Sequence, residues 1–281
     1  MKKIILSFYI SFAYGSLIAP EDGSVLNHTH ILFEWEQVPG ALSYDLQISE
    51  DINFSSTVSE VTDFSLAYIE KNYLNWGTTY YWRIRANFSN HSSDWLTPSL
   101  FTTSEALSSS SIDYIEPSQY QEGVTVFGAF FNYFSAAIDH TGKEIWNSGV
   151  NNFVYYSSNT DGNVFGCSLL SGAENNLPGM EFSFQNEIIW EEPNDEFLHH
   201  DIIKLPNGNY LGIVEINSLG PIPIGGWTTS FQNLGFQADG VTIEFPWVGD
   251  KLVEWDKDTK EVVWSWNTFD HFSMLDYDQF G

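Results

Sequence analysis

The segment Phe197–Glu215, with the sequence FLHHDIIKLPNGNYLGIVE, carries the strongest fold signal in this chain. Two runs of β-forming residues, Ile202–Leu205 and Tyr210–Glu215, flank the turn Pro206–Asn209. A proline and an Asn-Gly pair between such runs predict a β-hairpin, because Asn and Gly tolerate the positive φ angles that tight turns require. The predicted hairpin holds the polar residues His199–Asp201 at one end of a β-unit.

The two adjacent histidines of this segment need an explanation, since the whole chain has only seven. In one interpretation, one imidazole packs inward and the other lies in solvent. In the other, the pair does catalytic or metal-binding work. The residue types leave both interpretations open. A single metal ion held by His199 and His200 is disfavoured, because adjacent side chains on a strand point to opposite faces.

The composition indicates a folded, β-rich protein. Hydrophobic residues make up 43% and aromatic residues 17% of the 281 residues. This length suits one large or two ordinary domains. Lys and Arg number 10 against 37 Asp and Glu, which gives a formal charge of −27. Such a surface repels nucleic acids and anionic membranes, so we expect neither as a partner.

The chain has a single cysteine, Cys167. One cysteine excludes an intramolecular disulfide framework and a multi-cysteine metal site. We expect a buried, unreactive thiol at this position. We also expect no metal ion and no other cofactor.

The first residues have the pattern of a targeting segment. Lys2 and Lys3 form a basic start, the apolar run Ile4–Phe12 follows, and small residues come next. The run is too short for a membrane-spanning helix. It predicts a signal peptide over residues 1–16 and an exported protein, periplasmic or extracellular.

Residues 17–104 show period-two alternation in several short runs. In Ser43–Ser49 and in Thr79–Asn87, every second residue is apolar. This alternation is typical of half-buried strands in an antiparallel sandwich. The strand that carries Trp35, the run PGAxxYxLQI from residue 39 and the run LxxGxxYxWRIR from residue 74 together resemble a fibronectin type III domain. The resemblance implies a β-sandwich that serves as a spacer or docking module.

Residues 105–118 contain four consecutive serines and few core-forming residues, which predicts a linker. Beyond it, three segments repeat a strand–turn–strand pattern that ends on tryptophan: Ile138–Trp146, Phe182–Trp190 and Val253–Trp264. Repetition at about 45 residues, with four short strands in each unit, is typical of a β-propeller blade. The longer third unit carries an insertion at about residues 217–249.

We therefore expect an all-β chain: a fibronectin type III-like β-sandwich followed by an incomplete β-propeller over residues 119–281. This length holds about three blades, whereas closed propellers have four to eight. We expect the chain to be a fragment of a longer protein.

Three stretches together resemble the bacterial arylsulfate sulfotransferase family: FLHHDIIKLPNGNYL at 197–211, KLVEWDKDTKEVVWSW at 251–266 and FDHF at 269–272. The resemblance implies a six-bladed propeller with a central funnel. It also implies transfer of a sulfuryl group from a phenolic sulfate ester to a phenol acceptor through a sulfated histidine, without a nucleotide sulfate donor. A neutral imidazole is a competent nucleophile near pH 7.

The resemblance also implies roles for individual residues. His200 is the preferred funnel histidine that contacts the sulfuryl group, because the family pattern keeps a histidine directly before the aspartate, and His199 is the alternative. Asp201 either orients the histidine or is a hairpin residue only. His271 is either a supporting residue of the site or a loop histidine.

The family's sulfated histidine and its arginine come from later blades. The only arginines of this chain, Arg83 and Arg85, lie in the predicted sandwich. We therefore expect the 281-residue chain to be inactive by itself. An alternative is a non-catalytic secreted module that binds a carbohydrate or a cell-surface partner, because aromatic-rich surfaces suit sugars. A quinone-dependent dehydrogenase is disfavoured, since no set of metal-ligating Glu and Asn is recognisable.

Overall fold

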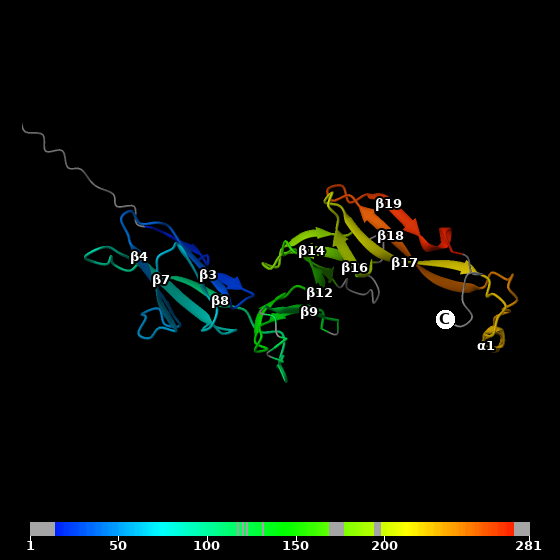
Figure 1. The fold of residues 1–281 in the computed structure, drawn as a ribbon, viewed down its shortest axis with the longest axis horizontal. Coiled ribbons are helices and arrows are strands. Elements are labelled where there is room, and N and C mark those ends of the chain that lie inside the picture. Colours follow the sequence, from blue (N-terminus) through cyan, green and yellow to red (C-terminus); the bar gives the residue numbers. More distant parts are fainter. Residues whose placement is uncertain are drawn as a thin grey trace, which may run out of the picture. The chain divides into compact units, whose positions relative to one another are not determined.

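The computed structural model describes residues 15–272 except 117, 120, 122, 131, 169–176 and 194–197 (Figure 1). The predicted signal peptide therefore lies almost entirely outside the described residues. Among these residues strands dominate and the one α-helix has six residues, so the predicted all-β class is confirmed. The chain divides into two compact units, Met1–Thr125 with Ala136–Gly149 and Val126–Ser135 with Val150–Gly281. No helix in the described part has the length and apolar character needed to span a membrane.

Two sheets of the first unit form a β-sandwich, with the strand orders β1-β3-β6 and β2-β8-β7-β4-β5. The strands are β1 (Leu17–Ala19), β2 (Ser24–Leu26), β3 (Ile31–Trp35), β4 (Ser43–Ser49), β5 (Ser59–Asp63), β6 (Ala67–Glu70), β7 (Thr79–Asn87) and β8 (Ser99–Thr103).

The apolar positions of both sheets meet in one core, as the period-two alternation predicts. Every second side chain of β7 is buried, among them Tyr80, Trp82 and Ile84. Phe33 of β3 packs edge-on against Trp82, with 5.1 Å between ring centroids, and against Phe101 of β8 at 5.7 Å. The sandwich over residues 17–104 therefore has the architecture that the fibronectin type III resemblance implies.

A third sheet has the order β11-β10-β9 and consists of β9 (Thr125–Ala129), β10 (Phe134–Ile138) and β11 (Glu144–Asn147). Its hairpin residues Ala136–Gly149 group with the sandwich in the first unit. The buried carboxylate of Glu144 accepts hydrogen bonds from the backbone N–H of Leu107, at 3.0 Å, and of Ser108, at 2.6 Å. The segment predicted as a linker therefore begins with residues that are fixed in the first unit.

The second unit contains two successive four-stranded antiparallel sheets. The first has the order β12-β13-β14-β15 and the second the order β16-β17-β18-β19. Their bounds are β12 (Phe153–Ser158), β13 (Val164–Ser168), β14 (Gly179–Phe182), β15 (Ile188–Glu191), β16 (Leu198–Lys204), β17 (Tyr210–Gly220), β18 (Phe245–Trp255) and β19 (Val262–Asn267). Within each sheet, each strand pairs with the next along the chain. The first predicted repeat segment, Ile138–Trp146, lies instead in the three-stranded sheet β11-β10-β9.

The two sheets share a hydrophobic core, which includes Trp190, the last residue of the second repeat segment. Trp190 of β15 stacks on Tyr210 of β17 with 3.9 Å between ring centroids and 12° between ring planes. Trp190 also packs against Trp255 of β18 at 6.1 Å. All three rings are buried, so each tryptophan contributes to the contact between one sheet and the next.

The insertion extends the central hairpin of the second sheet. β17 and β18 pair along their whole length, from Tyr210 opposite Trp255 to Gly220 opposite Phe245. β16 and β19 pair only with the half of this ribbon nearest Tyr210 and Trp255. The other half is two-stranded and leads to α1 (Thr228–Asn233) at its tip (Figure 1). Four aromatic rings pack together there: Phe231, Phe236, Phe245 and Trp247.

Candidate functional site

The predicted hairpin of the opening segment is present, and its turn has the expected geometry. Gly208 has a φ of 91°, which is the left-handed region that glycine tolerates. The N–H of Gly208 donates to the carbonyl of Leu205 at 2.9 Å, and the N–H of Leu205 donates to the carbonyl of Asn209 at 2.8 Å. The turn therefore joins β16 and β17 and places His199–Asp201 on β16.

β16 contains a bulge at these three residues. Leu198 pairs with Val214 and Ile202 pairs with Gly212, so His199–Asp201 lie opposite the single residue Ile213. A bulge bends its strand and changes the direction of the side chains, and bulges are common next to active sites. The expectation that His199 and His200 point to opposite faces assumed a regular strand, and the side chains that would test it lie outside the described residues.

The structure fixes part of the surroundings of the bulge. The side chains of His199 and His200 lie outside the described residues. Asp201 is exposed, whereas the next residue, Ile202, is fully buried in the core between the two sheets. The bulge is thus held in place at its C-terminal end by the packing of Ile202.

Two buried groups on the neighbouring sheet complete the described part of the site. Burial strongly raises the pKa of the Tyr156 phenol on β12, and the nearby Cys167, Asp201 and Glu192 raise it further. Burial also raises the pKa of the Cys167 thiol to about 11, although a hydrogen bond with Tyr156 opposes this shift. Both groups therefore stay protonated at neutral pH. Cys167 is buried and free, as predicted.

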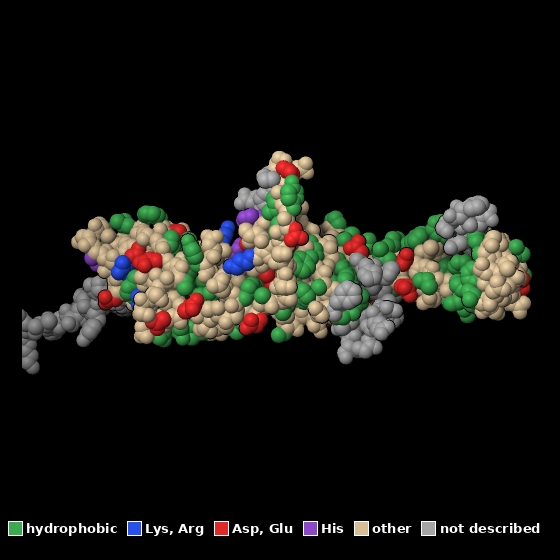
Figure 2. Space-filling view, turned by 90° about the horizontal axis from the view of Figure 1, so that it is seen from below, with side chains coloured by type: hydrophobic (Ala, Val, Ile, Leu, Met, Phe, Trp, Pro, Cys, Tyr) green, Lys and Arg blue, Asp and Glu red, His purple; other side chains and the backbone are tan. Residues whose placement is uncertain are grey.

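The charges described around the bulge are negative. Asp201 and Glu192 both raise the pKa of the Tyr156 phenol. Lys204, the last residue of β16, pairs with Glu181 at 2.9 Å. Acidic side chains also outnumber basic ones on the face shown in Figure 2, in keeping with the formal charge of −27. Within the described ranges, no group of three or more His, Cys, Asp or Glu side chains is arranged to hold a metal ion.

His271 does not join the bulge. It follows the short helix η1 (Thr268–Asp270), and its ring stacks on Trp266 of β19 with 4.8 Å between centroids and 8° between planes. β19 and β16 are opposite edges of the same sheet, three strand spacings or about 14 Å apart. The stacking gives His271 a local structural role, which favours the loop-histidine interpretation.

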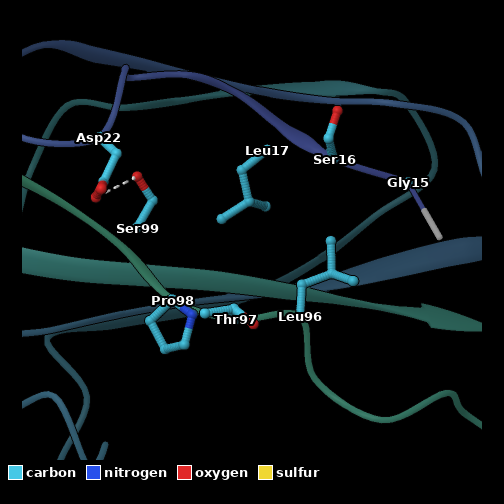
Figure 3. Close-up of a pocket in the computed structure, with 8 residues that line it drawn as sticks. All are labelled: Gly15, Ser16, Leu17, Asp22, Leu96, Thr97, Pro98 and Ser99. Carbon is cyan, nitrogen blue, oxygen red and sulfur yellow. Dashed lines mark hydrogen bonds between the residues drawn. The ribbon is translucent and has the colours of Figure 1, made fainter.

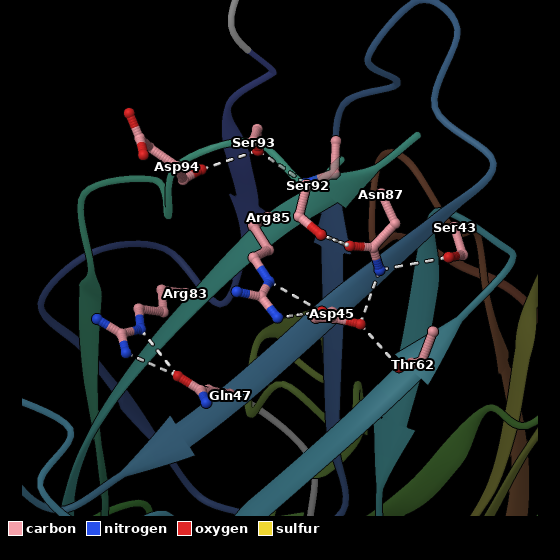
Figure 4. Close-up of polar contacts among 11 residues, drawn as sticks. Ser43, Asp45, Gln47, Thr62, Arg83, Arg85, Asn87, Ser92, Ser93 and Asp94 are labelled. Atoms are coloured by element: carbon pink, nitrogen blue, oxygen red, sulfur yellow. Dashed lines mark hydrogen bonds and ion pairs between the residues drawn. The ribbon is translucent and has the colours of Figure 1, made fainter. Parts of the chain in front are cut away.

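The two arginines form a stacked cluster on the sandwich that the sequence did not reveal. The Arg83 guanidinium lies 3.8 Å from the ring centre of Phe54 and 4.5 Å from that of Trp95. Arg85 lies 4.6 Å from the Trp95 ring and pairs with Asp45 at 2.8 Å (Figure 4). Both arginines are thus engaged on one face of β7. The alternation of Arg83 and Arg85 with buried residues was the only sequence signal for this cluster.

Two surface pockets lie in the first unit. The first, of about 370 Å³, lies between the chain at Gly15–Leu17 and the chain at Leu96–Ser99 (Figure 3). Its single acidic side chain, Asp22, accepts a hydrogen bond from the backbone N–H of Leu100. The second, of about 480 Å³, is lined by residues between 112 and 125 together with Asp139 and His140.

The sequence matches no protein-family model and no curated protein. Among solved structures, a fibronectin type III-like protein from Clostridium thermocellum has 19% identity and a TM-score of 0.26, over 30% of this chain and 90% of that one. The FN1–FN3 domains of chicken CNTN1 have 11% identity and a TM-score of 0.28, over 71% of this chain and 59% of theirs. The twitchin kinase region of C. elegans has 14% identity and a TM-score of 0.22, over 72% and 41%. At these scores the likenesses carry no argument about function, and the fold class rests on the sheets themselves.

Proposed function

We propose that the second unit is part of a β-propeller of the arylsulfate sulfotransferase type, in an exported protein. The bulge at His199–Asp201 carries this proposal. It lies on the first strand of a four-stranded antiparallel sheet that stacks on another sheet of the same kind. In a propeller the blades surround a central channel, so residues on the strand of each blade nearest the axis are available to a ligand there.

The ligands of this site are a phenolic sulfate ester as donor and a phenol as acceptor, and no cofactor takes part. His200, with His199 as the alternative, contacts the sulfuryl group, and Asp201 orients the imidazole. Transfer breaks the sulfur–oxygen bond of the donor, whose phenolate leaves and takes up a proton. A sulfur–oxygen bond then forms to the acceptor phenol, whose hydroxyl loses its proton. Sulfuryl transfer also needs cations that neutralise the sulfate oxygens.

The described charges around the bulge do not supply those cations. Asp201 and Glu192 are negative, Lys204 is paired with Glu181, and both arginines belong to the sandwich. We therefore expect the chain to bind a phenolic sulfate ester weakly and not to turn it over.

The test is a titration of the full chain with p-nitrophenyl sulfate, followed by NMR of the histidine side chains. We expect His200→Ala to weaken binding by about ten- to a hundredfold, because one hydrogen bond to a charged group contributes about 1.5–3 kcal/mol. His271→Ala is the matched control and should bind like the unaltered chain, since that ring is stacked on Trp266.

Equal binding by both variants, or no binding by the unaltered chain, would contradict the proposed site. Release of p-nitrophenolate in the presence of phenol would instead contradict the expectation of inactivity. Binding of a sugar without binding of the sulfate ester would favour the non-catalytic secreted module.

A further inference from the structure

In the second unit, two side chains of the second sheet contact a glutamate and a tryptophan of the first sheet. Glu181 of β14 and Trp190 of β15 are cross-strand partners. One carboxylate oxygen of Glu181, Oε2, accepts a hydrogen bond from Lys204 Nζ at 2.9 Å and another from the Tyr210 hydroxyl. The Trp190 ring stacks on Tyr210. The two ends of the hairpin, Lys204 and Tyr210, therefore cover the Glu181–Trp190 pair, which we call the filled pair.

The same pair recurs at the equivalent place in the second sheet. Glu254 of β18 and Trp264 of β19 are cross-strand partners. In both sheets the strand register shifts at the residue after the glutamate, and two aliphatic residues precede the tryptophan. The neighbours of Glu254 on β18, Val253 and Trp255, are buried toward the first sheet. By the alternation of side chains along a strand, Glu254 and Trp264 lie on the opposite face.

No described side chain covers the Glu254–Trp264 pair in the way that Lys204 and Tyr210 cover the filled pair, so we call it the open pair. Trp190 is 4% exposed, whereas Trp264 is 48% exposed. The carboxylate of Glu254 accepts hydrogen bonds from the side-chain amides of Asn207 and Asn209, and both bonds end on Oε1. Within the described residues Oε2 has no partner, although the corresponding atom of Glu181 accepts both Lys204 and Tyr210.

We propose that the Glu254–Trp264 pair is the docking site for a further antiparallel β-sheet that begins with a hairpin of the Lys204–Tyr210 type. Its lysine and tyrosine hydroxyl would donate to Glu254 Oε2, and its tyrosine ring would cover Trp264. The filled pair within the same unit is the precedent for this occupant. A second copy of the chain does not fit, because its own Lys204 and Tyr210 are held by its own Glu181 and Trp190. This assembly is independent of sulfuryl transfer.

The test supplies such a sheet to the full chain. A copy of residues 194–272 is joined to the C-terminus through a Gly/Ser linker, because isolated hairpins are marginally stable and tethering raises the local concentration. Hydroxyl-radical footprinting with mass spectrometry then reports the solvent access of Trp264. We expect its oxidation rate to fall to that of Trp190.

The matched control is the same fusion with Lys204→Ala and Tyr210→Ala in the appended copy alone, and there Trp264 should remain reactive. A backbone-cyclised peptide of the sequence IIKLPNGNYLG, titrated against the chain labelled with 5-fluorotryptophan, repeats the test without the need for the copy to fold. If neither the fusion nor the peptide affects Trp264, the proposal is wrong. It is also wrong if Trp264 of the unaltered chain becomes protected as protein concentration rises, since a second copy would then cover it.

Discussion

At the scale of the residue, Glu181 shows how one carboxylate connects two sheets. It is almost fully buried, and a buried carboxylate without partners costs several kcal/mol because it loses its hydration. A charge-assisted hydrogen bond from Lys204 and a bond from the Tyr210 hydroxyl offset this cost. Burial and Glu181 together raise the pKa of Tyr210 well above its usual range, so its hydroxyl remains a donor at neutral pH.

We expect Glu181→Gln to lower the free energy of unfolding by about 2–3 kcal/mol, because Lys204 loses its charged acceptor in a mostly buried setting. Glu254→Gln removes the corresponding charge from the open pair and should cost about 0.5–1 kcal/mol. Urea unfolding followed by tryptophan fluorescence measures both. Equal losses in the two variants would show that the filled pair contributes nothing beyond the open one.

At the scale of the element, sequence periodicity predicted the strands well where each residue has one partner. Alternation in β4 and β7 gave the sandwich, and Pro206–Asn209 gave the turn between β16 and β17. The bulge at His199–Asp201 was not predictable from periodicity. A bulge changes the pairing between two strands and requires no particular residue types, so the sequence pattern does not indicate it. The sequence therefore predicted the hairpin that carries His199–Asp201 but not the bulge at these residues.

Contacts between distant residues were the other part that the sequence did not reveal. Residues 105–118 have the composition of a linker, but Leu107 and Ser108 donate to Glu144, which is more than thirty residues away. The stacking of Trp95 on Arg83 likewise joins a loop to β7. Local composition holds no information on such contacts, because they depend on how the elements pack.

The pairing of β4 with β7 gives a prediction for pH. Burial alone would raise the pKa of Asp45, but hydrogen bonds from Thr62, Asn87 and Arg85 hold it below its ordinary value of 3.8. A carboxyl group with a lowered pKa in the folded state stabilises the fold above its unfolded pKa, and this stabilisation is lost as the pH falls through the folded pKa. The relevant window therefore lies below pH 3.8.

We expect Asp45→Asn to cost about 1 kcal/mol at pH 7, since the ion pair with Arg85 is only partly buried. The difference from the unaltered chain should shrink at an acidic pH below 3.8, as the Asp45 carboxyl group becomes protonated. Urea unfolding at the two pH values measures this. A difference that stays constant between them would mean that the charge of Asp45 does not stabilise the sandwich.

At the scale of the whole molecule, the two units have separate cores and are stabilised by different contacts. Glu144 stabilises the first unit. Its carboxylate accepts hydrogen bonds from Leu107 and Ser108 and from the side-chain amide of Asn147 at 2.6 Å. Its backbone carbonyl accepts a hydrogen bond from Trp76 Nε1 at 2.8 Å. The second unit depends on the ring contacts of Trp190, Tyr210 and Trp255. A change in one set of contacts should therefore leave the other set intact.

We expect Glu144→Ala to leave the N–H groups of Leu107 and Ser108 without an acceptor and to destabilise the hairpin Ala136–Gly149 by about 1–3 kcal/mol. Hydrogen exchange with mass spectrometry should show faster exchange in residues 105–108 and in this hairpin. The strands β17 and β18 serve as the internal control and should exchange as before. Faster exchange throughout β17 would contradict separate stabilisation of the two units.

The filled Glu181–Trp190 pair also bears on the order in which the sheets of the second unit can assemble during synthesis. The sheet that carries the pair precedes, along the chain, the hairpin Lys204–Tyr210 that fills it. During synthesis from the N-terminus, the receiving surface therefore leaves the ribosome before the side chains that bind it. Contacts limited to neighbouring sheets make the stability a sum of nearest-neighbour steps, so this unit can grow one sheet at a time in the order of translation.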